Sequence, residues 1–122
     1  MTKVRIIIAG GRDFNDYLQL RDTFTNFMAP YKNSEVTVIS GMAKGADTLG
    51  IQIAKQYGLP VIEMPANWDH YGKSAGHIRN AEMAKIGTHL LAAWDGKSKG
   101  TKGMIDISKK LKLEIRIMLY KK

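Results

Sequence analysis

Five short apolar runs, separated by segments with helical spacing, constrain the fold of this chain more than any other feature. The runs are residues 4–9, 36–39, 61–64, 89–94 and 113–119. Four intervening segments repeat apolar residues at the spacing of a buried helix face, the first with Leu20, Phe24, Phe27 and Met28, the second with Leu49, Ile53, Ala54 and Tyr57, the third over about 76–86 and the fourth over about 101–111. This βαβ alternation with short links predicts a Rossmann-like three-layer sandwich, in which helices cover both faces of a five-stranded, mainly parallel sheet.

The composition of the strands indicates how each one is buried. The first three runs are almost continuously apolar, as is typical of strands covered on both faces. In the last run, Leu113, Ile115, Ile117 and Leu119 alternate with Glu114 and Arg116, which predicts an edge strand with one exposed face. A chain of 122 residues has room for one ordinary core, so we expect a single domain over residues 1–122.

Composition and charge exclude several classes of protein. The chain has no cysteine, so it has no disulfide, thiolate metal site or cysteine nucleophile, and a reducing cytoplasm is the expected location. No apolar run approaches 18 residues, and residues 1–11 suit a first strand better than a signal peptide, so no membrane association is expected. The net charge of +8 is concentrated in residues 97–122, which carry 9 Lys and Arg against Asp106 and Glu114. Such a segment attracts anions or nucleic acid, or it serves only as a solubilising tail.

A polar segment rich in glycine follows each of the first four strands. These segments are GGRDF (10–14), SGMAKGAD (40–47), PANWDHYGKSAGHIRN (65–80) and DGKSKGTKG (95–103). The carboxyl ends of parallel strands meet at one rim of the sheet, where ligands of such folds bind. Glycines let backbone N–H groups approach a ligand, and the helix that follows adds the positive end of its dipole. The rim therefore predicts an anion site suited to a phosphate or carboxylate.

Side chains in these segments supply the other groups that a nucleotide needs. Arg12, Lys44 and Arg79 offer positive charge, and Trp68 and Trp94 offer flat surfaces for a base, although Trp94 suits the core equally well. Asp13, Asp47, Asn67 and Asn80 can bond ribose hydroxyls, although Asp47 also suits a helix cap and the arginines suit ion pairs. The predicted ligand-binding residues are Gly10, Gly11, Arg12, Asp13, Ser40, Gly41, Met42, Lys44, Gly45, Asp47, Asn67, Trp68, Arg79, Asn80, Gly100 and Thr101.

No single motif is decisive. GGRDF differs from G-x-G-x-x-G because Arg12 stands where the second glycine belongs, and GMAKGAD lacks the Gly-Lys-Ser/Thr of a Walker A loop. His70, His77 and His89 have no metal-ligand spacing, so neither a metal nor a cofactor is predicted, and His89 is expected to be structural. Gly41 and Gly45 are expected to expose backbone to the ligand, so that a side chain at Gly45 would clash with it.

Together these segments resemble the YspA-like branch of the SLOG superfamily, which is related to the LOG phosphoribohydrolases and to DprA. The resemblance extends over about residues 4–111 and rests on SG-A-GAD and on the AG-RN-M pattern of residues 75–83. It implies that Ser40, Gly41, Gly45 and Asp47 form a phosphosugar-binding loop. It also implies that Gly100 and Thr101 begin a phosphate-binding helix, and that Arg79 and Asn80 line the pocket.

One departure from the family bears on catalysis. LOG enzymes carry P-G-G-x-G-T-x-E-E, whereas here Gly100 and Thr101 are followed by Lys102, Gly103 and Met104. Cleavage of an N-glycosidic bond depends on carboxylates, and a lysine would repel the positive charge that develops on the sugar. Asp13 and Asp47, with Asp95, are the candidates that could substitute.

Three functions follow from these features. The first is a sensor or sequestering protein for a nucleotide or an ADP-ribose-like phosphosugar. The alternative is a nucleoside-monophosphate N-glycosidase, and the third is single-stranded nucleic-acid binding through the basic segment, in which few aromatic side chains could stack bases. A homodimer or higher homo-oligomer is expected, with Ile78, Ala81 and Met83 as candidate contacts.

Overall fold

The fold is a parallel sheet enclosed between two layers of helices. In this computed structural model, which describes residues 2–121, the strands are β1 (Lys3–Gly10), β2 (Glu35–Ser40), β3 (Val61–Glu63), β4 (His89–Trp94) and β5 (Glu114–Leu119). They form one sheet in the order β3-β2-β1-β4-β5, and every neighbouring pair is parallel. The predicted Rossmann-like three-layer architecture is confirmed.

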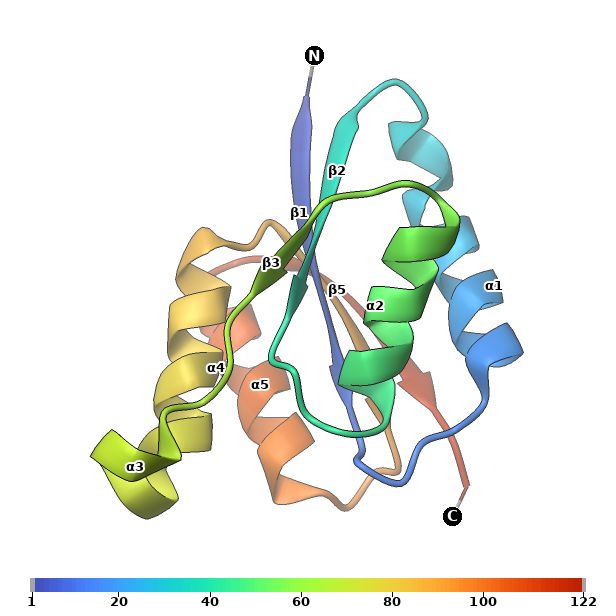
Figure 1. Cartoon of the computed structure of the whole chain (residues 1–122). Helices are drawn as coiled ribbons and strands as arrows, with labels where there is room; N and C mark the ends of the chain where they lie inside the picture. Colours follow the sequence, from blue (N-terminus) through green and yellow to red (C-terminus); the bar gives the residue numbers. More distant parts are fainter. Residues whose placement is uncertain (1, 122) are drawn as a thin grey trace.

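The helices divide between the two faces of the sheet. Figure 1 shows α1 (Tyr17–Met28) and α2 (Ala46–Gln56) on one face, and α4 (Ala75–Ile86) and α5 (Lys99–Lys110) on the other. A short helix that the periodicity did not predict, α3 (Trp68–Tyr71), lies in the loop after β3, and 3₁₀ turns occur at η1 (Ala29–Tyr31) and η2 (Gly72–Ser74). Helix α3 begins because the Asn67 side chain accepts a hydrogen bond from the His70 amide at 3.2 Å.

The central strand β1 contributes to both hydrophobic cores. Ile6 and Ile8 point into the core under α1 and α2, whereas Ile7 and Ala9 point into the core under α4 and α5. This alternation is the period-2 geometry of a strand, and a continuous apolar run results because both faces are covered. The prediction of double-sided burial is therefore confirmed for the first strand.

The two edge strands agree with the sequence expectation only in part. Val61 packs against the core under α1 and α2, and Ile62 packs against the core under α4 and α5, so both faces of β3 are covered as predicted. The burial is only partial because β3 pairs with β2 alone. Strand β5 lies at the other edge as predicted, but Ile117 and Leu119 are exposed and Met118 is buried. Arg116 is half-buried on this edge because its guanidinium lies over the Phe27 ring, 4.9 Å from its centroid.

The topology fixes where a ligand can bind. From β1 the chain moves outward through β2 and β3, then crosses to the other side of β1 to form β4 and β5. The strand order therefore reverses between β1 and β4, and the loops that leave these two strands diverge there. Among residues 2–121, no helix is both long and apolar enough to cross a membrane.

Candidate functional site

A cavity of about 570 Å³ lies at this switch point, at the carboxyl rim of the sheet. Its walls come from the loops after β1 and β4 and from α3, α4 and α5. The residues predicted from the sequence that line it are Gly10, Gly11, Arg12, Asp13, Asp47, Trp68, Arg79, Asn80, Gly100 and Thr101. Three of the four glycine-rich segments thus supply most of these residues, and from SGMAKGAD only Ala43 and Asp47 reach the cavity.

Backbone hydrogen bonds to β4 and α2 hold the loop after β1 in place. The Gly11 amide donates to the Ala93 carbonyl of β4 at 3.1 Å, and the Gly11 carbonyl accepts from the Ala46 amide of α2 at 3.2 Å. Gly10 has a φ of +157°, and a Cβ there would meet the Ala93 backbone. The close approach of β1 and β4 at this point therefore requires glycine.

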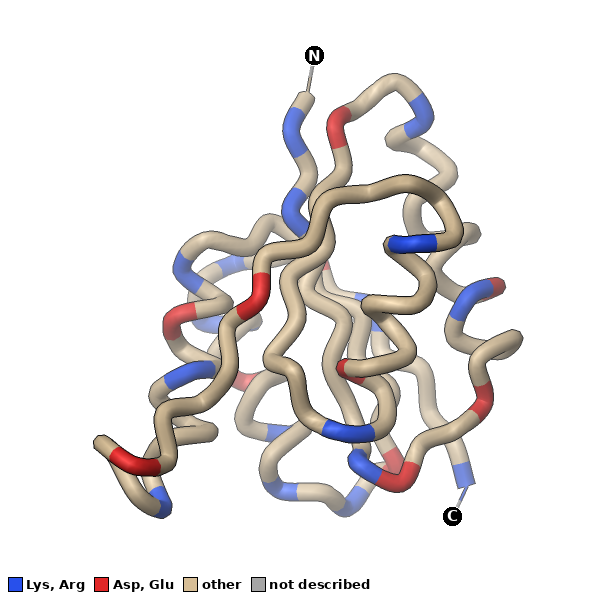
Figure 2. The backbone as a smooth tube through the Cα atoms, viewed as in Figure 1, with Lys and Arg blue, Asp and Glu red and all other residues tan. Residues whose placement is uncertain are grey.

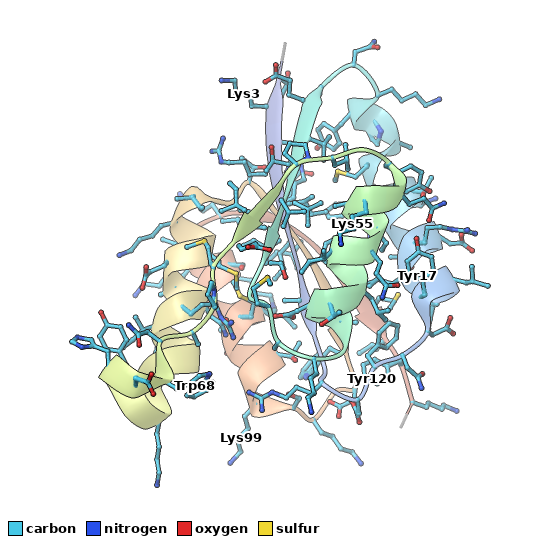
Figure 3. The ribbon with its side chains drawn as sticks, in the orientation of Figure 1. Lys3, Tyr17, Lys55, Trp68, Lys99 and Tyr120 are labelled. Carbon is cyan, nitrogen blue, oxygen red and sulfur yellow. The ribbon has the colours of Figure 1, made fainter. Side chains whose placement is uncertain are left out.

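The start of α5 forms the opposite wall. Asp95 Oδ1 accepts from the amides of Lys97 at 2.8 Å and Ser98 at 2.7 Å, and Ser98 Oγ caps the helix by accepting from the Thr101 amide at 3.5 Å. The amides of Lys99 and Gly100 stand in the first turn, where a helix has no acceptor for them. The positive end of the α5 dipole therefore lies beside the cavity, and Figure 3 shows Lys99 at this end of the helix.

Arg79 and Asp47 meet at the inner wall. Arg79 donates from Nη1 to the Gly41 carbonyl at 2.5 Å and from Nε to Asn80 Oδ1 at 2.8 Å. Asp47 is 4% exposed, and its Oδ2 accepts from the Ala43 amide at 3.3 Å. Burial raises the pKa of Asp47 to about 6, against the opposing effects of the Ala43 hydrogen bond and the positive charge of Arg79. Asp47 stands in the first turn of α2, but the N-cap position belongs to Gly45.

The second glycine-rich loop, residues 40–47, bonds several of its amides to other protein groups and not to the cavity. The Met42 amide donates to Ser40 Oγ at 3.1 Å, and the Ala43 and Ala46 amides donate to Asp47 and Gly11. A Cβ at Gly41 would meet Arg79 and Asp47. A Cβ at Gly45 would overlap the Gly11 carbonyl, not a ligand in the cavity. The predicted residues that do not line the cavity are Ser40, Gly41, Met42, Lys44, Gly45 and Asn67.

Other lining residues were not predicted from the sequence. Ser98 and Lys99 could have been predicted from the sequence. A serine three positions before Thr101 is an N-cap pattern, and it places the start of the helix at Lys99 and not at about residue 101. Met83 and Met104 line the cavity as well as the core, and an apolar helical position gives no sign of this second role. Met83 is 1% exposed, so its predicted part in a dimer contact is wrong.

Two of the other candidates have structural partners. Trp94 does not line the cavity; it packs on the core, and its indole N–H donates to the Ser98 carbonyl at 3.1 Å. His89 begins β4, where its ring contacts Thr88 Oγ1 at 2.7 Å and Tyr31 Oη at 2.9 Å, so the predicted structural position is confirmed.

Asp47 makes the stability of the fold depend on pH. Its folded-state pKa of about 6 lies above the ordinary 3.8, so the folded protein binds the extra proton between these values and the free energy of unfolding falls as pH rises. We expect a loss of about 3 kcal/mol between pH about 4 and pH about 7. Asp47→Asn cannot ionise and should flatten this part of the profile, measured by urea unfolding.

The comparison isolates Asp47 because the other groups are the same in both proteins. Burial lowers the pKa of His89, which acts in the opposite direction, since stability is then lost as pH falls. Identical profiles for the wild type and Asp47→Asn would contradict the assignment.

Gly45 offers a steric test of how the two loops pack. Gly45 and Gly58 both have positive φ, +78° and +66°, but only Gly45 faces backbone, whereas nothing lies within 4 Å of a Cβ at Gly58. Gly45→Ala should therefore lower the free energy of unfolding by about 1–3 kcal/mol more than Gly58→Ala. Equal losses in chemical denaturation would show that the loops can separate at little cost.

The comparisons with known proteins agree with this fold. The family described as YspA, cpYpsA-related SLOG matches residues 4–71. The Gene 61 protein of Mycobacterium phage D29 is 32% identical over 106 residues, which cover 80% of this chain and 82% of that protein.

Two solved structures of DNA processing protein A (DprA) are similar in fold. They are the protein from Streptococcus pneumoniae, with a TM-score of 0.70 and 16% identity, and the protein from Helicobacter pylori, with a TM-score of 0.62 and 15% identity. The matches cover 95% of this chain but only 50% and 65% of those chains, and the low identity shows a shared fold alone. These sequence matches show that the chain belongs to the YspA, cpYpsA-related SLOG family.

Proposed function

We propose that this protein binds a nucleotide or a similar phosphosugar in the cavity at the β1–β4 switch point, as a sensor or sequestering protein. The observation that carries the proposal is that one cavity joins a polar end, where Arg12 and Lys99 stand beside the free amides of a helix start, to an exposed aromatic ring. The same end also carries the carboxylates of Asp13 and Asp95. A cavity of about 570 Å³ is within the range typical of small-molecule sites.

The phosphate end is the wall formed by the loop after β1 and the start of α5. The first-turn amides of Lys99 and Gly100 and the side chains of Arg12 and Lys99 supply donors and charge there. Figure 2 shows Lys and Arg positions gathered along this lower rim of the molecule. Because the Met42, Ala43 and Ala46 amides around the second loop are already bonded, the phosphate is expected at α5 and not at residues 40–45.

The base end is the side formed by α3. Trp68 is 50% exposed although its ring lines the cavity, and its edge packs against Gly76, where a Cβ would stand 3.5 Å from it. Figure 3 shows the side chain beside the α3 ribbon at the lower edge of the molecule. A half-exposed indole at the mouth of a polar cavity suits a nucleobase that stacks on it.

The two ends can be tested separately with matched ligands. Trp68→Ala should weaken binding of adenosine 5′-monophosphate by about 1–3 kcal/mol and leave binding of ribose 5-phosphate unchanged, because only the base stacks. Lys99→Ala should weaken both ligands. Affinities are measured by isothermal titration calorimetry, supported by thermal shift, since ligand at 100 times Kd adds about 2.7 kcal/mol of stability.

The chain offers a control for each variant. Tyr71 lies on the same short helix and is 43% exposed, but it does not line the cavity, and Lys97 lies two residues from Lys99 outside the lining. Neither Tyr71→Ala nor Lys97→Ala should change affinity. Absence of binding by any nucleotide at millimolar concentration would refute the proposal, and release of free adenine that is lost in Asp47→Asn would replace it with the N-glycosidase alternative.

Single-stranded DNA is a second candidate ligand. DNA processing protein A from Helicobacter pylori, which has the same fold, binds single-stranded DNA, and the basic rim here could contact a phosphate backbone. Binding of an oligothymidine should then weaken steeply with salt, with a slope that reflects the phosphates contacted, in a fluorescence anisotropy titration. Competition by adenosine 5′-monophosphate would place the strand in the cavity, and a flat salt response would remove this candidate.

A further inference from the structure

Tyr120, which follows β5, reaches back to the loop after β1. Its amide donates to the Trp94 carbonyl of β4 at 3.0 Å, and its hydroxyl donates to Asp13 Oδ1 at 2.7 Å. Its ring meets the Phe14 ring edge-on, with 4.8 Å between the centroids and 65° between the planes. A residue far along the chain thus contacts both Asp13 and Phe14 within the first glycine-rich segment.

The same phenol lies directly over Gly11. A Cβ built at Gly11 would overlap the Tyr120 hydroxyl and would stand 3.1 Å from its Cζ atom. Gly11 is also bonded through its amide to Ala93 and through its carbonyl to Ala46. The loop that lines the cavity is therefore held by β4, by α2 and by Tyr120. Two side chains contribute: Asp47 of α2, which is bonded to the Gly10 backbone, and Tyr120, which is bonded to Asp13.

We infer that Tyr120 is a positioning residue, which fixes the loop of residues 10–13 in the arrangement that binds the ligand. This inference rests on the proposed nucleotide site, to which Gly11, Arg12 and Asp13 contribute walls. The family match ends at residue 71, so Tyr120 lies outside it. The contact also explains why Gly11 carries no side chain although its φ does not require glycine.

The electrostatics of the contact are consistent with this role. Burial, reinforced by the hydrogen bond to Asp13 and its charge, raises the pKa of the Tyr120 hydroxyl. A phenol is in any case protonated at neutral pH, so Tyr120 is the donor of this hydrogen bond. Asp13 Oδ1 is then an acceptor oriented by that donor. The hydrogen bond from Tyr120 holds the Asp13 carboxylate in place, and the same bond fixes the position of the loop.

Tyr120→Phe removes the hydroxyl and keeps the ring, and Tyr57→Phe is its matched control. The Tyr57 hydroxyl also has a side-chain partner, Thr25 Oγ1 at 3.2 Å, but it lies at the far end of α2 from the cavity. Hydrogen exchange is followed at the amides of Gly11, Phe14 and Ala46, whose hydrogen bonds all involve Gly11. Affinity for adenosine 5′-monophosphate is measured by calorimetry on the same proteins, with their melting temperatures as a check on folding.

We expect Tyr120→Phe to speed exchange at these three amides and to weaken binding by roughly tenfold, while Tyr57→Phe changes neither. A second pair of variants tests the close approach of Tyr120 to Gly11. Gly11→Ala should lower the melting temperature of the wild type, and it should lower that of Tyr120→Ala much less, because the clashing phenol is absent there. Unchanged exchange in Tyr120→Phe, or faster exchange with unchanged affinity, would overturn the role of Tyr120. Absence of binding by the wild type would instead overturn the nucleotide site, and the exchange data would still report on the loop.

Discussion

The site depends on the close packing of the β1 and β4 ends around Gly10 and Gly11. The Ala93 carbonyl accepts from the Gly11 amide, and Gly10 leaves no room for a side chain between the strands. Because the sheet order reverses between these strands, their loops diverge immediately beyond this contact and leave the cavity between them. If the strand ends were spread, the loop wall and the α5 wall would no longer face one ligand.

The sequence predicted the fold because its periodicities are strong and agree with one another. Apolar runs of strand length alternate with helical spacing, and a parallel sheet with right-handed crossovers is the architecture that satisfies both. The burial of edge strands was not predictable in the same way. Strand β3 is as apolar as an inner strand but has one neighbour, and on β5 the charged Arg116 lies on the core side with its guanidinium over the Phe27 ring.

The rim was predictable, but the role of each loop was not. Glycine marks both a loop that approaches a ligand and a loop that packs tightly on protein, and the two cases look alike in sequence. At Gly100 the space is open, whereas at Gly41 and Gly45 it is filled by Arg79, Asp47 and the first loop. The contacts of Tyr120 with Gly11 and Asp13 join distant parts of the chain, so no local pattern could reveal them.

The most direct test of this account is a nuclear magnetic resonance titration of the amides with adenosine 5′-monophosphate. The account predicts shift changes at Gly11, Asn80 and Gly100, on three walls of the cavity, and at the Trp68 indole. The amides of Met42 and Ala43, already bonded within the protein, should move little. Changes concentrated at residues 40–45, or confined to the lysines at the far end of α5, would contradict it.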